Sequence, residues 1–268
     1  MNRTVMTLPE GSIGAGFLQD VAQTVRVILD EEVNRFFGRL APKEVGWKDA
    51  NQAVTPADLS IERKLIASLD TILPGGVVAE ESGNRDAWRL GGVTWIIDPI
   101  DGSGEFIQGS AEFATTVALW SGDRIEAAWI YAPIKAQMWS AQHGRGWRLN
   151  GEPLYPRGRG VQVSVTADQY ISGHLQNVAA RLRAAGERIV PCRTVSLAYT
   201  ELATGGLDAA IYDWDKPWDH AAGVLLCSEA GLRARHVSGQ RYDPSQPWPA
   251  PLLIAPCDRW DALARLAR

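Results

Sequence analysis

Two carboxylates stand three positions apart at the end of an apolar run in the first half of the chain. The run Trp95-Ile96-Ile97 leads into Asp98 and Asp101, and a Gly-Ser-Gly turn follows at once from Gly102. Carboxylate oxygens are the ligands that Mg²⁺ prefers, and the N–H groups of a turn that opens a helix can face a phosphate oxygen. The stretch therefore predicts metal-assisted hydrolysis of a phosphate ester.

Other predicted elements also end or begin in acidic residues. The short apolar run 77–79 ends in Glu80 and Glu81, and Asp219 stands at or near the N-cap of a predicted helix. Taken alone, each acidic residue has an ordinary interpretation as a turn residue, a solvated pair or a helix cap. Together they suit a reaction in which one ion binds the phosphoryl and leaving oxygens while another lowers the pKa of the attacking water. The candidate ligands are Glu80, Asp98, Asp101 and Asp219.

The elements that must position these side chains are predicted from periodicity and turn residues. Apolar residues spaced by three and four predict an amphipathic helix over 17–37. The polar segment 48–54 is expected to form a loop. A second helix is expected over 55–69, with Thr55 as its N-cap and Asp58 in its first turn, where the helix dipole favours an anion. On this pattern Asp58 is a helix-start residue.

The rest of the chain shows two further patterns of predicted secondary structure. Short alternating segments separated by turns predict an antiparallel meander over 114–149. Strands and helices then alternate, which favours an α/β layer. The stretch 153–160, rich in Pro, Gly and Arg, is the best candidate for a boundary. We therefore expect an N-terminal α+β half over 1–155, which carries the metal site, and a C-terminal α/β half over 156–268, which completes it.

Composition limits the classes of function. The 268-residue chain is 46% hydrophobic, enough for a sizeable core, and its formal net charge of -4 gives no basic footprint for nucleic acid. The three cysteines are widely spaced and match neither a zinc site nor a disulfide framework. The sequence has no apolar stretch of about 18 residues, and its N-terminus lacks a continuous apolar segment. We expect a cytoplasmic protein with a small phosphorylated metabolite as its partner, and neither a membrane nor a nucleic acid.

Four segments resemble motifs of the inositol monophosphatase family. Residues 98–103, Asp-Pro-Ile-Asp-Gly-Ser, resemble its D-P-[IL]-D-G-[ST] signature, and residues 218–223, Trp-Asp-His-Ala-Ala-Gly, resemble W-D-x-A-[AP]-G. Residues 80–82 are similar to its G-E-E-S and residues 54–58 to its V-T-x-A-D. The motifs follow the family's order. The resemblance implies a layered α/β/α/β/α sandwich of the inositol monophosphatase type, usually a homodimer, with two or three Mg²⁺ ions and inhibition by Li⁺.

The resemblance also implies roles for individual residues. The N–H groups of Gly102 and Ser103 would bind the phosphate, and the Ser103 hydroxyl would help to orient the attacking water. Glu81, beside a ligand, would support the site, and Ser196 is expected either to face the leaving group or to cap the helix that follows it. The implied metal ligands are the side chains of Glu80, Asp98, Asp101 and Asp219 and the main-chain carbonyl of Ile100.

Three positions depart from the family's pattern. Relatives often carry an acidic residue where this chain has Gln52, and there it helps to bind a third metal and to activate water; Asp49 is the candidate substitute. Tyr212 takes the place of a Glu that binds substrate hydroxyls in inositol-specific relatives, and a phenol still donates a hydrogen bond. Residues 104–107 replace the usual T-N-F and are similar to bisphosphate nucleotidases, while 106–109 resemble histidinol-phosphate phosphatases.

The sequence thus predicts a Mg²⁺-dependent phosphomonoesterase that acts on a small sugar or polyol phosphate. A bisphosphate nucleotidase and a histidinol-phosphate phosphatase on the same fold remain open as alternatives. A metal-binding regulatory protein with vestigial activity is the alternative from another class, because Gln52 weakens the activation of water.

Overall fold

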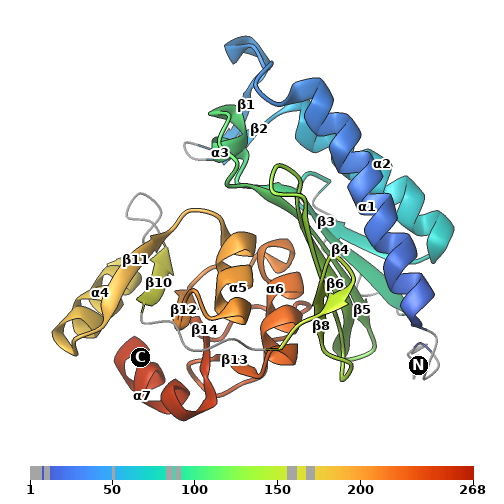
Figure 1. The fold of residues 1–268 in the computed structure, drawn as a ribbon. Helices are drawn as coiled ribbons and strands as arrows, with labels where there is room; N and C mark the ends of the chain where they lie inside the picture. Colours follow the sequence, from blue (N-terminus) through green and yellow to red (C-terminus); the bar gives the residue numbers. More distant parts are fainter. Residues whose placement is uncertain are drawn as a thin grey trace.

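The chain folds into alternating layers of helices and sheets in the order α/β/α/β/α (Figure 1), as the resemblance implied. The computed structural model describes residues 8, 13–49, 52–82, 87, 92–155, 162–166 and 173–268. The outer and middle helical layers are α1 (Ala15–Phe36) with α2 (Pro56–Ile72), α5 (Val195–Thr204) with α6 (Pro217–Glu229), and α4 (Gly173–Ala184) with α7 (Cys257–Ala267).

A seven-stranded sheet lies between the first two helical layers. Its order is β3-β4-β5-β6-β7-β8-β9; β3 and β4 are parallel and the later neighbours are antiparallel, so the predicted meander is confirmed. The strands are β3 (Gly76–Ala79), β4 (Val93–Asp101), β5 (Ala114–Ser121), β6 (Arg124–Ala132), β7 (Gln137–Gln142), β8 (Trp147–Leu149) and β9 (Glu152–Pro153).

A five-stranded sheet of order β11-β10-β12-β14-β13 lies beyond α5 and α6. Its parallel strands β11, β10 and β12 alternate with helices along the chain, as predicted, and β14 joins them antiparallel. The sequence prediction missed β13, an edge strand with charged residues that pairs with β14. The strands are β10 (Gln162–Thr166), β11 (Arg188–Cys192), β12 (Ala209–Tyr212), β13 (Leu232–His236) and β14 (Leu252–Pro256).

The segment predicted as a loop before α2 is instead a short hairpin. β1 (Gly46–Asp49) and β2 (Gln52–Val54) pair antiparallel with a register shift between Trp47 and Asp49. The prediction of a loop was wrong because main-chain hydrogen bonds form these strands without an apolar alternation that the sequence could display. A small 3₁₀ helix, η1 (Pro42–Glu44), precedes the hairpin, and α3 (Ser103–Ile107) follows β4.

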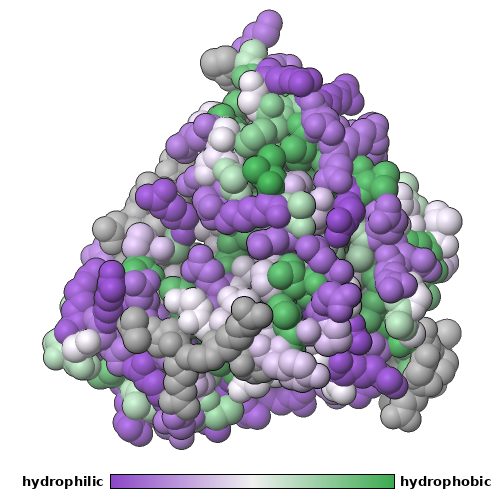
Figure 2. All heavy atoms as spheres, in the orientation of Figure 1, coloured by the Kyte–Doolittle hydropathy of each residue, from purple (hydrophilic) through white to green (hydrophobic). Residues whose placement is uncertain are grey.

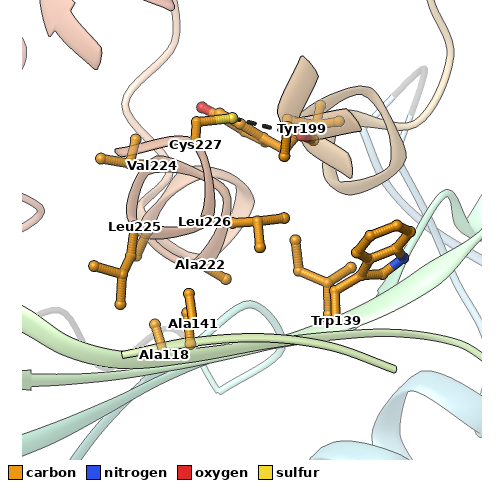
Figure 3. Close-up of a cluster of buried hydrophobic side chains, with 14 of the residues drawn as sticks. Ala118, Trp139, Ala141, Tyr199, Ala222, Val224, Leu225, Leu226 and Cys227 are labelled. Carbon is orange, nitrogen blue, oxygen red and sulfur yellow. Dashed lines mark hydrogen bonds between the residues drawn. The ribbon is translucent and has the colours of Figure 1, made fainter. Parts of the chain in front are cut away.

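Small residues let α6 approach both the large sheet and α5. In Figure 3, Ala118 and Ala141 of the sheet lie opposite Ala222 on α6. On the side toward α5, a side chain at Gly223 would place its Cβ only 2.1 Å from ring carbons of Tyr199. The close packing fixes the position of α6, and with it the start of the helix, where Asp219 lies.

On the face drawn in Figure 2, hydrophilic residues cover most of the surface and hydrophobic residues gather in smaller patches. Within the described ranges, the helices are too short or too polar to traverse a lipid bilayer.

Candidate active site

The parallel strands β3 and β4 bring their acidic ends to the same edge of the large sheet. Ala79 pairs with Ile97 in their register, and the N–H of Glu80 donates to the carbonyl of Ile97 at 3.2 Å. Glu80 therefore leaves β3 next to Asp98, which follows Ile97 on β4. Glu80 and Asp98 are separated along the chain, but they lie side by side because neighbouring parallel strands have their carboxyl ends at the same edge of the sheet.

A bulge in β4 sets the direction of the second aspartate. Asp98 and Asp101 lie within the strand, not after it as the sequence suggested, and the register with β5 shifts between them. In a regular strand, residues three apart point to opposite faces, and an extra residue in a bulge re-aims the side chain that follows. Asp101 Oδ2 accepts the main-chain N–H of Ser196 at 2.5 Å, which ties this carboxylate to the start of α5.

A hydroxyl on β5 fixes the start of α6 over the same edge. Thr116 is the partner of Asp98 in the sheet, and its hydroxyl donates to the carbonyl of Trp218 at 2.9 Å. Asp219 follows immediately in the first turn of α6, whose N-cap is Lys216. Asp219 Oδ2 in turn accepts the indole N–H of Trp214 at 2.6 Å. These contacts bring a residue from the second half of the chain to β4.

Burial and like charges raise the pKa values of the three aspartates together. Burial raises the pKa of Asp98 well above its usual range, and Glu80, Asp101 and Asp219 raise it further. Burial also raises the pKa of Asp101 to about 6 and that of Asp219 to about 8, and Glu80 adds to both. The four predicted ligands therefore share one electrostatic environment. Buried like charges are costly, and a bound cation relieves that cost.

The oxygen atoms present fit a hard cation such as Mg²⁺. Asp98 Oδ1 is buried and has no hydrogen-bond partner among the described residues, which is the condition of an oxygen available to a metal. Within the same part of the chain, no three Asp, Glu, His or Cys side chains stand close enough to surround a single ion by themselves. Mg²⁺ needs only one or two carboxylates each, because waters and substrate phosphate complete its shell.

Gly102 gives the turn after β4 a shape that few other residues allow. Its φ of +93° lies in the left-handed region, and a Cβ there would lie 3.1 Å from both the carbonyl of Glu112 and the hydroxyl of Thr194. Ser103 then opens α3, as predicted. The first N–H groups of a helix have no partner within the helix, so they are available to an anion.

Asp58 is a site residue that the sequence prediction missed. Its Oδ2 accepts the main-chain N–H and the hydroxyl of Thr55 at 2.7 and 2.6 Å, so the predicted helix start is confirmed. Its other oxygen, Oδ1, lies 3.1 Å from the hydroxyl of Ser103, a contact across 45 residues. Burial raises the pKa of Asp58 to about 6. The capping pattern accounts for only one oxygen. The resemblance of residues 54–58 to V-T-x-A-D marked this position but gave no role for the other oxygen.

Two predicted substrate contacts are buried in this structure. The main chain of Ser196 binds Asp101, and its hydroxyl is buried without a hydrogen-bond partner in the described part of the chain. Tyr212 is fully buried, its ring packs against Tyr199 and Trp214, and its hydroxyl likewise lacks a described partner. Neither hydroxyl is presented to solvent.

The supporting residue Glu81 is paired with a lysine from the β1–β2 hairpin. Lys48 Nζ lies 2.6 Å from Glu81 Oε1 and 3.3 Å from Glu80 Oε1. Burial raises the pKa of Glu81 to about 7, although Lys48 opposes the shift. Asp49, the candidate substitute, and Gln52, which stands where relatives often carry an acidic residue, pair through their main chains in this hairpin. Their side chains lie outside the described residues, so the prediction that Asp49 replaces that acidic residue stays a prediction.

Comparisons with known proteins agree with the motifs. The profile of the inositol monophosphatase family matches residues 16–266. A protein of Pseudomonas aeruginosa named Nus factor SuhB is 32% identical over 215 residues, which cover 75% of this chain and 78% of the relative. An inositol monophosphatase of Dictyostelium discoideum is 28% identical over 249 residues, covering 85% of this chain and 87% of the relative.

Solved structures share the same fold. The extragenic suppressor protein suhB of Bartonella henselae superposes with a TM-score of 0.80 at 23% identity, covering 93% of this chain and 98% of the other. An IMPase of Thermotoga maritima gives a TM-score of 0.78 at 21% identity, covering 93% of this chain and 96% of the other.

Proposed function

Because this chain belongs to the inositol monophosphatase family, we propose that it is a Mg²⁺-dependent phosphomonoesterase acting on a small sugar or polyol phosphate. The observation that carries the proposal is the group of acids Glu80, Asp98, Asp101 and Asp219 at one edge of the sheet, where Asp98 is buried and the pKa values of the three aspartates are raised. Their oxygens, with the carbonyl of Ile100, would hold two or three ions. Bound Mg²⁺ would supply a more acidic water and stabilise charge on the phosphoryl oxygens.

The chain's own groups would position water and phosphate. The Ser103 hydroxyl lies between Asp58 Oδ1 and the carbonyl of Ile100, at 3.1 and 3.0 Å. When Ser103 donates to Asp58, its oxygen can accept a hydrogen bond from the attacking water and orient it. The N–H groups of Gly102 and Ser103 would hold phosphate oxygens. Water then attacks phosphorus and gives up a proton, the bond to the leaving oxygen breaks, and that oxygen takes up a proton, so that one water is consumed and the alcohol and inorganic phosphate are released.

Several finer features carry over from the family as part of the proposal. We expect inhibition by Li⁺, a homodimer in solution and a cytoplasmic location. The site would join the two halves of the chain, because Glu80, Asp98 and Asp101 come from 1–155 and Asp219 from 156–268. Light scattering after size-exclusion chromatography measures the oligomer directly.

A panel of phosphate esters tests the reaction and its substrate. We expect Mg²⁺-dependent release of phosphate, lost in Asp98→Asn while the variant stays folded. Absence of turnover on every ester by folded wild-type protein contradicts the proposal. A preference of about 100-fold for adenosine 3′,5′-bisphosphate over inositol 1-phosphate would identify a bisphosphate nucleotidase instead. The same preference for histidinol phosphate over inositol 1-phosphate would identify a histidinol-phosphate phosphatase. The buried Tyr212 gives no charged contact to inositol hydroxyls, which supports including all three.

A regulatory protein is the second candidate, and the name of a relative favours it. The Pseudomonas aeruginosa protein at 32% identity is called a Nus factor. On this alternative, the chain would bind Mg²⁺ without turning over any ester and would be recovered with a partner protein. Turnover that depends on Asp98 rejects the alternative as the sole function.

A further inference from the structure

A second carboxylate on α2 contacts the turn that carries Glu80. The Glu62 side chain is buried at 4% exposure. Its Oε2 accepts the main-chain N–H of Glu81 at 2.7 Å, and its Oε1 accepts the main-chain N–H of Ser82 at 2.8 Å. Both oxygens of one buried acid thus bind successive N–H groups of a turn that lies outside its own helix. Such charge-assisted bonds to main-chain N–H groups are stronger than neutral ones.

The spacing along α2 links this contact to the rest of the site. Asp58 and Glu62 are four residues apart, so they lie on the same face of the helix. Asp58 contacts Ser103 at 3.1 Å, and Glu62 binds the turn 80–82 one helical turn later. Between them Ile61 is fully buried in the core below. α2 therefore holds the Ser103 hydroxyl and the turn 80–82 at a fixed separation.

The bonds from Glu62 are the buried side-chain contacts that hold this turn, because its other contacts are a main-chain pairing and a partly exposed lysine. The N–H of Glu80 continues the pairing with β4 at Ile97. Lys48 contacts the carboxylates of Glu80 and Glu81, but its side chain is 28% exposed, and solvent and salt weaken the pairing of an exposed charge.

We propose that Glu62 is a positioning residue, which fixes the turn 80–82 so that Glu80 is already oriented for metal binding. The inference rests on the proposed function in one respect: it takes Glu80 as a metal ligand. Partners that orient a ligand typically change metal affinity about 10- to 100-fold when they are lost. Since both Glu62 oxygens bind main-chain N–H groups of the turn, its loss should raise the metal concentration for half-maximal activity more than it lowers kcat at saturating metal.

The test is binding of Mn²⁺ to the full-length protein, with free Mn²⁺ measured by electron paramagnetic resonance. Glu62→Gln keeps one acceptor oxygen and turns an NH₂ group toward a main-chain N–H, so one bond is replaced by a repulsion. Glu32→Gln is the matched control. Glu32 is a fully buried acid on α1 in the same helical layer, paired with Lys64 at 2.6 Å, and among the described residues it makes no hydrogen bond or ion pair with the candidate site. Both variants lose a buried carboxylate, so both should lose thermal stability.

The expected result is Mn²⁺ binding about 10- to 100-fold weaker in Glu62→Gln, with Glu32→Gln unchanged. Glu62→Asp, whose shorter side chain lengthens both bonds, should fall between wild type and Glu62→Gln, and it replaces the amide variant if that one fails to fold. Unchanged binding in a folded Glu62 variant, while Glu80→Gln loses affinity, overturns the positioning role and leaves the proposed function intact. Unchanged binding in Glu80→Gln instead overturns the assignment of Glu80 as a ligand, and the inference with it.

Discussion

Asp98 is the residue of the candidate site whose environment is the most unfavourable for a charged carboxylate. Its Oδ1 is buried without a described hydrogen-bond partner, and three other acids add to its raised pKa. A residue that only stabilised the fold would not combine burial, missing partners and repulsion, because each of these is unfavourable. Such a conflict is the usual mark of a residue kept for its chemistry.

Asp98→Asn should therefore preserve the stability of the metal-free protein and abolish its stabilisation by Mg²⁺. We expect the variant to melt in EDTA at the same temperature as wild type or a few degrees higher, because a repelling charge is gone. Mg²⁺ should raise the melting temperature of wild type, since a ligand bound only to the folded state stabilises it, but should not raise that of the variant. Differential scanning fluorimetry with and without Mg²⁺ measures both. An equal Mg²⁺ shift in the two proteins contradicts the assignment.

Ser103→Ala should reduce turnover without loosening the metal site. Removing the hydroxyl held by Asp58 should lower kcat by about 10²- to 10⁴-fold, the usual contribution of a group that positions or transfers a proton. Mn²⁺ affinity should stay within a factor of about two, because no metal ligand changes. Ser110→Ala, at an exposed turn where the hydroxyl caps the N–H of Glu112, is the control. Full activity in Ser103→Ala rules out the orienting role.

At the scale of elements, the contact of α5 with α6 decides where Asp219 lies. Gly223 lies against the ring of Tyr199, and Thr116 fixes the helix start through the carbonyl of Trp218. The helix therefore has little freedom to shift along or away from the sheet. A motif glycine that looks like a local feature of the sequence is, in the fold, a contact between two helices.

Gly223→Ala should destabilise the protein by about 1–3 kcal/mol or more, because the added Cβ overlaps the Tyr199 ring. The same clash should displace the start of α6 and weaken metal binding. Gly16→Ala is the matched control: Gly16 is an exposed residue in the first turn of α1 with nothing within 4 Å of a Cβ, so the change should stabilise the helix by up to about 1 kcal/mol. Urea denaturation compares the two. Equal stability of Gly223→Ala and wild type contradicts the packing argument.

At the scale of the whole molecule, a buried histidine couples stability to pH. His236 is 2% exposed, its Nδ1 donates to the carbonyl of Ala250 at 2.8 Å, and Tyr242 and Trp248 flank the ring. Burial lowers its pKa, although the bonds to the carbonyls of Ala250 and Pro251 oppose the shift. The unfolded chain takes up this proton below about pH 6.5, where the folded protein still excludes it.

The stability that the neutral His236 contributes is thus complete above about pH 6.5 and is lost as the pH falls toward the lower folded pKa. His236→Asn keeps a donor near Ala250 but does not titrate. We expect the stability advantage of wild type over this variant to shrink between about pH 7 and pH 5, as measured by denaturation at each pH. The exposed His143→Asn is the control. A difference that stays constant with pH contradicts the coupling.

The sequence by itself determined the class of chemistry and most of the elements. Periodicity located α1 and α2, turn residues located the meander, and the spacing of Asp98, Asp101 and Gly102 predicted a metal and phosphate site. These features are local, because a helix, a turn or a motif needs only neighbouring residues to specify it. Local signals failed for the β1–β2 hairpin and for β13, which depend on main-chain pairing with a partner strand.

Only the tertiary structure decided which distant residues act together. Asp58 reaches Ser103 across 45 residues, and Glu62 reaches Glu81 across 19, through side-chain oxygens that no local pattern distinguishes. The buried position of Tyr212 was equally invisible, since burial depends on packing between layers. The reason is physical: a motif fixes the type and order of groups, whereas the distances between groups from different segments arise when the sheets and helices pack.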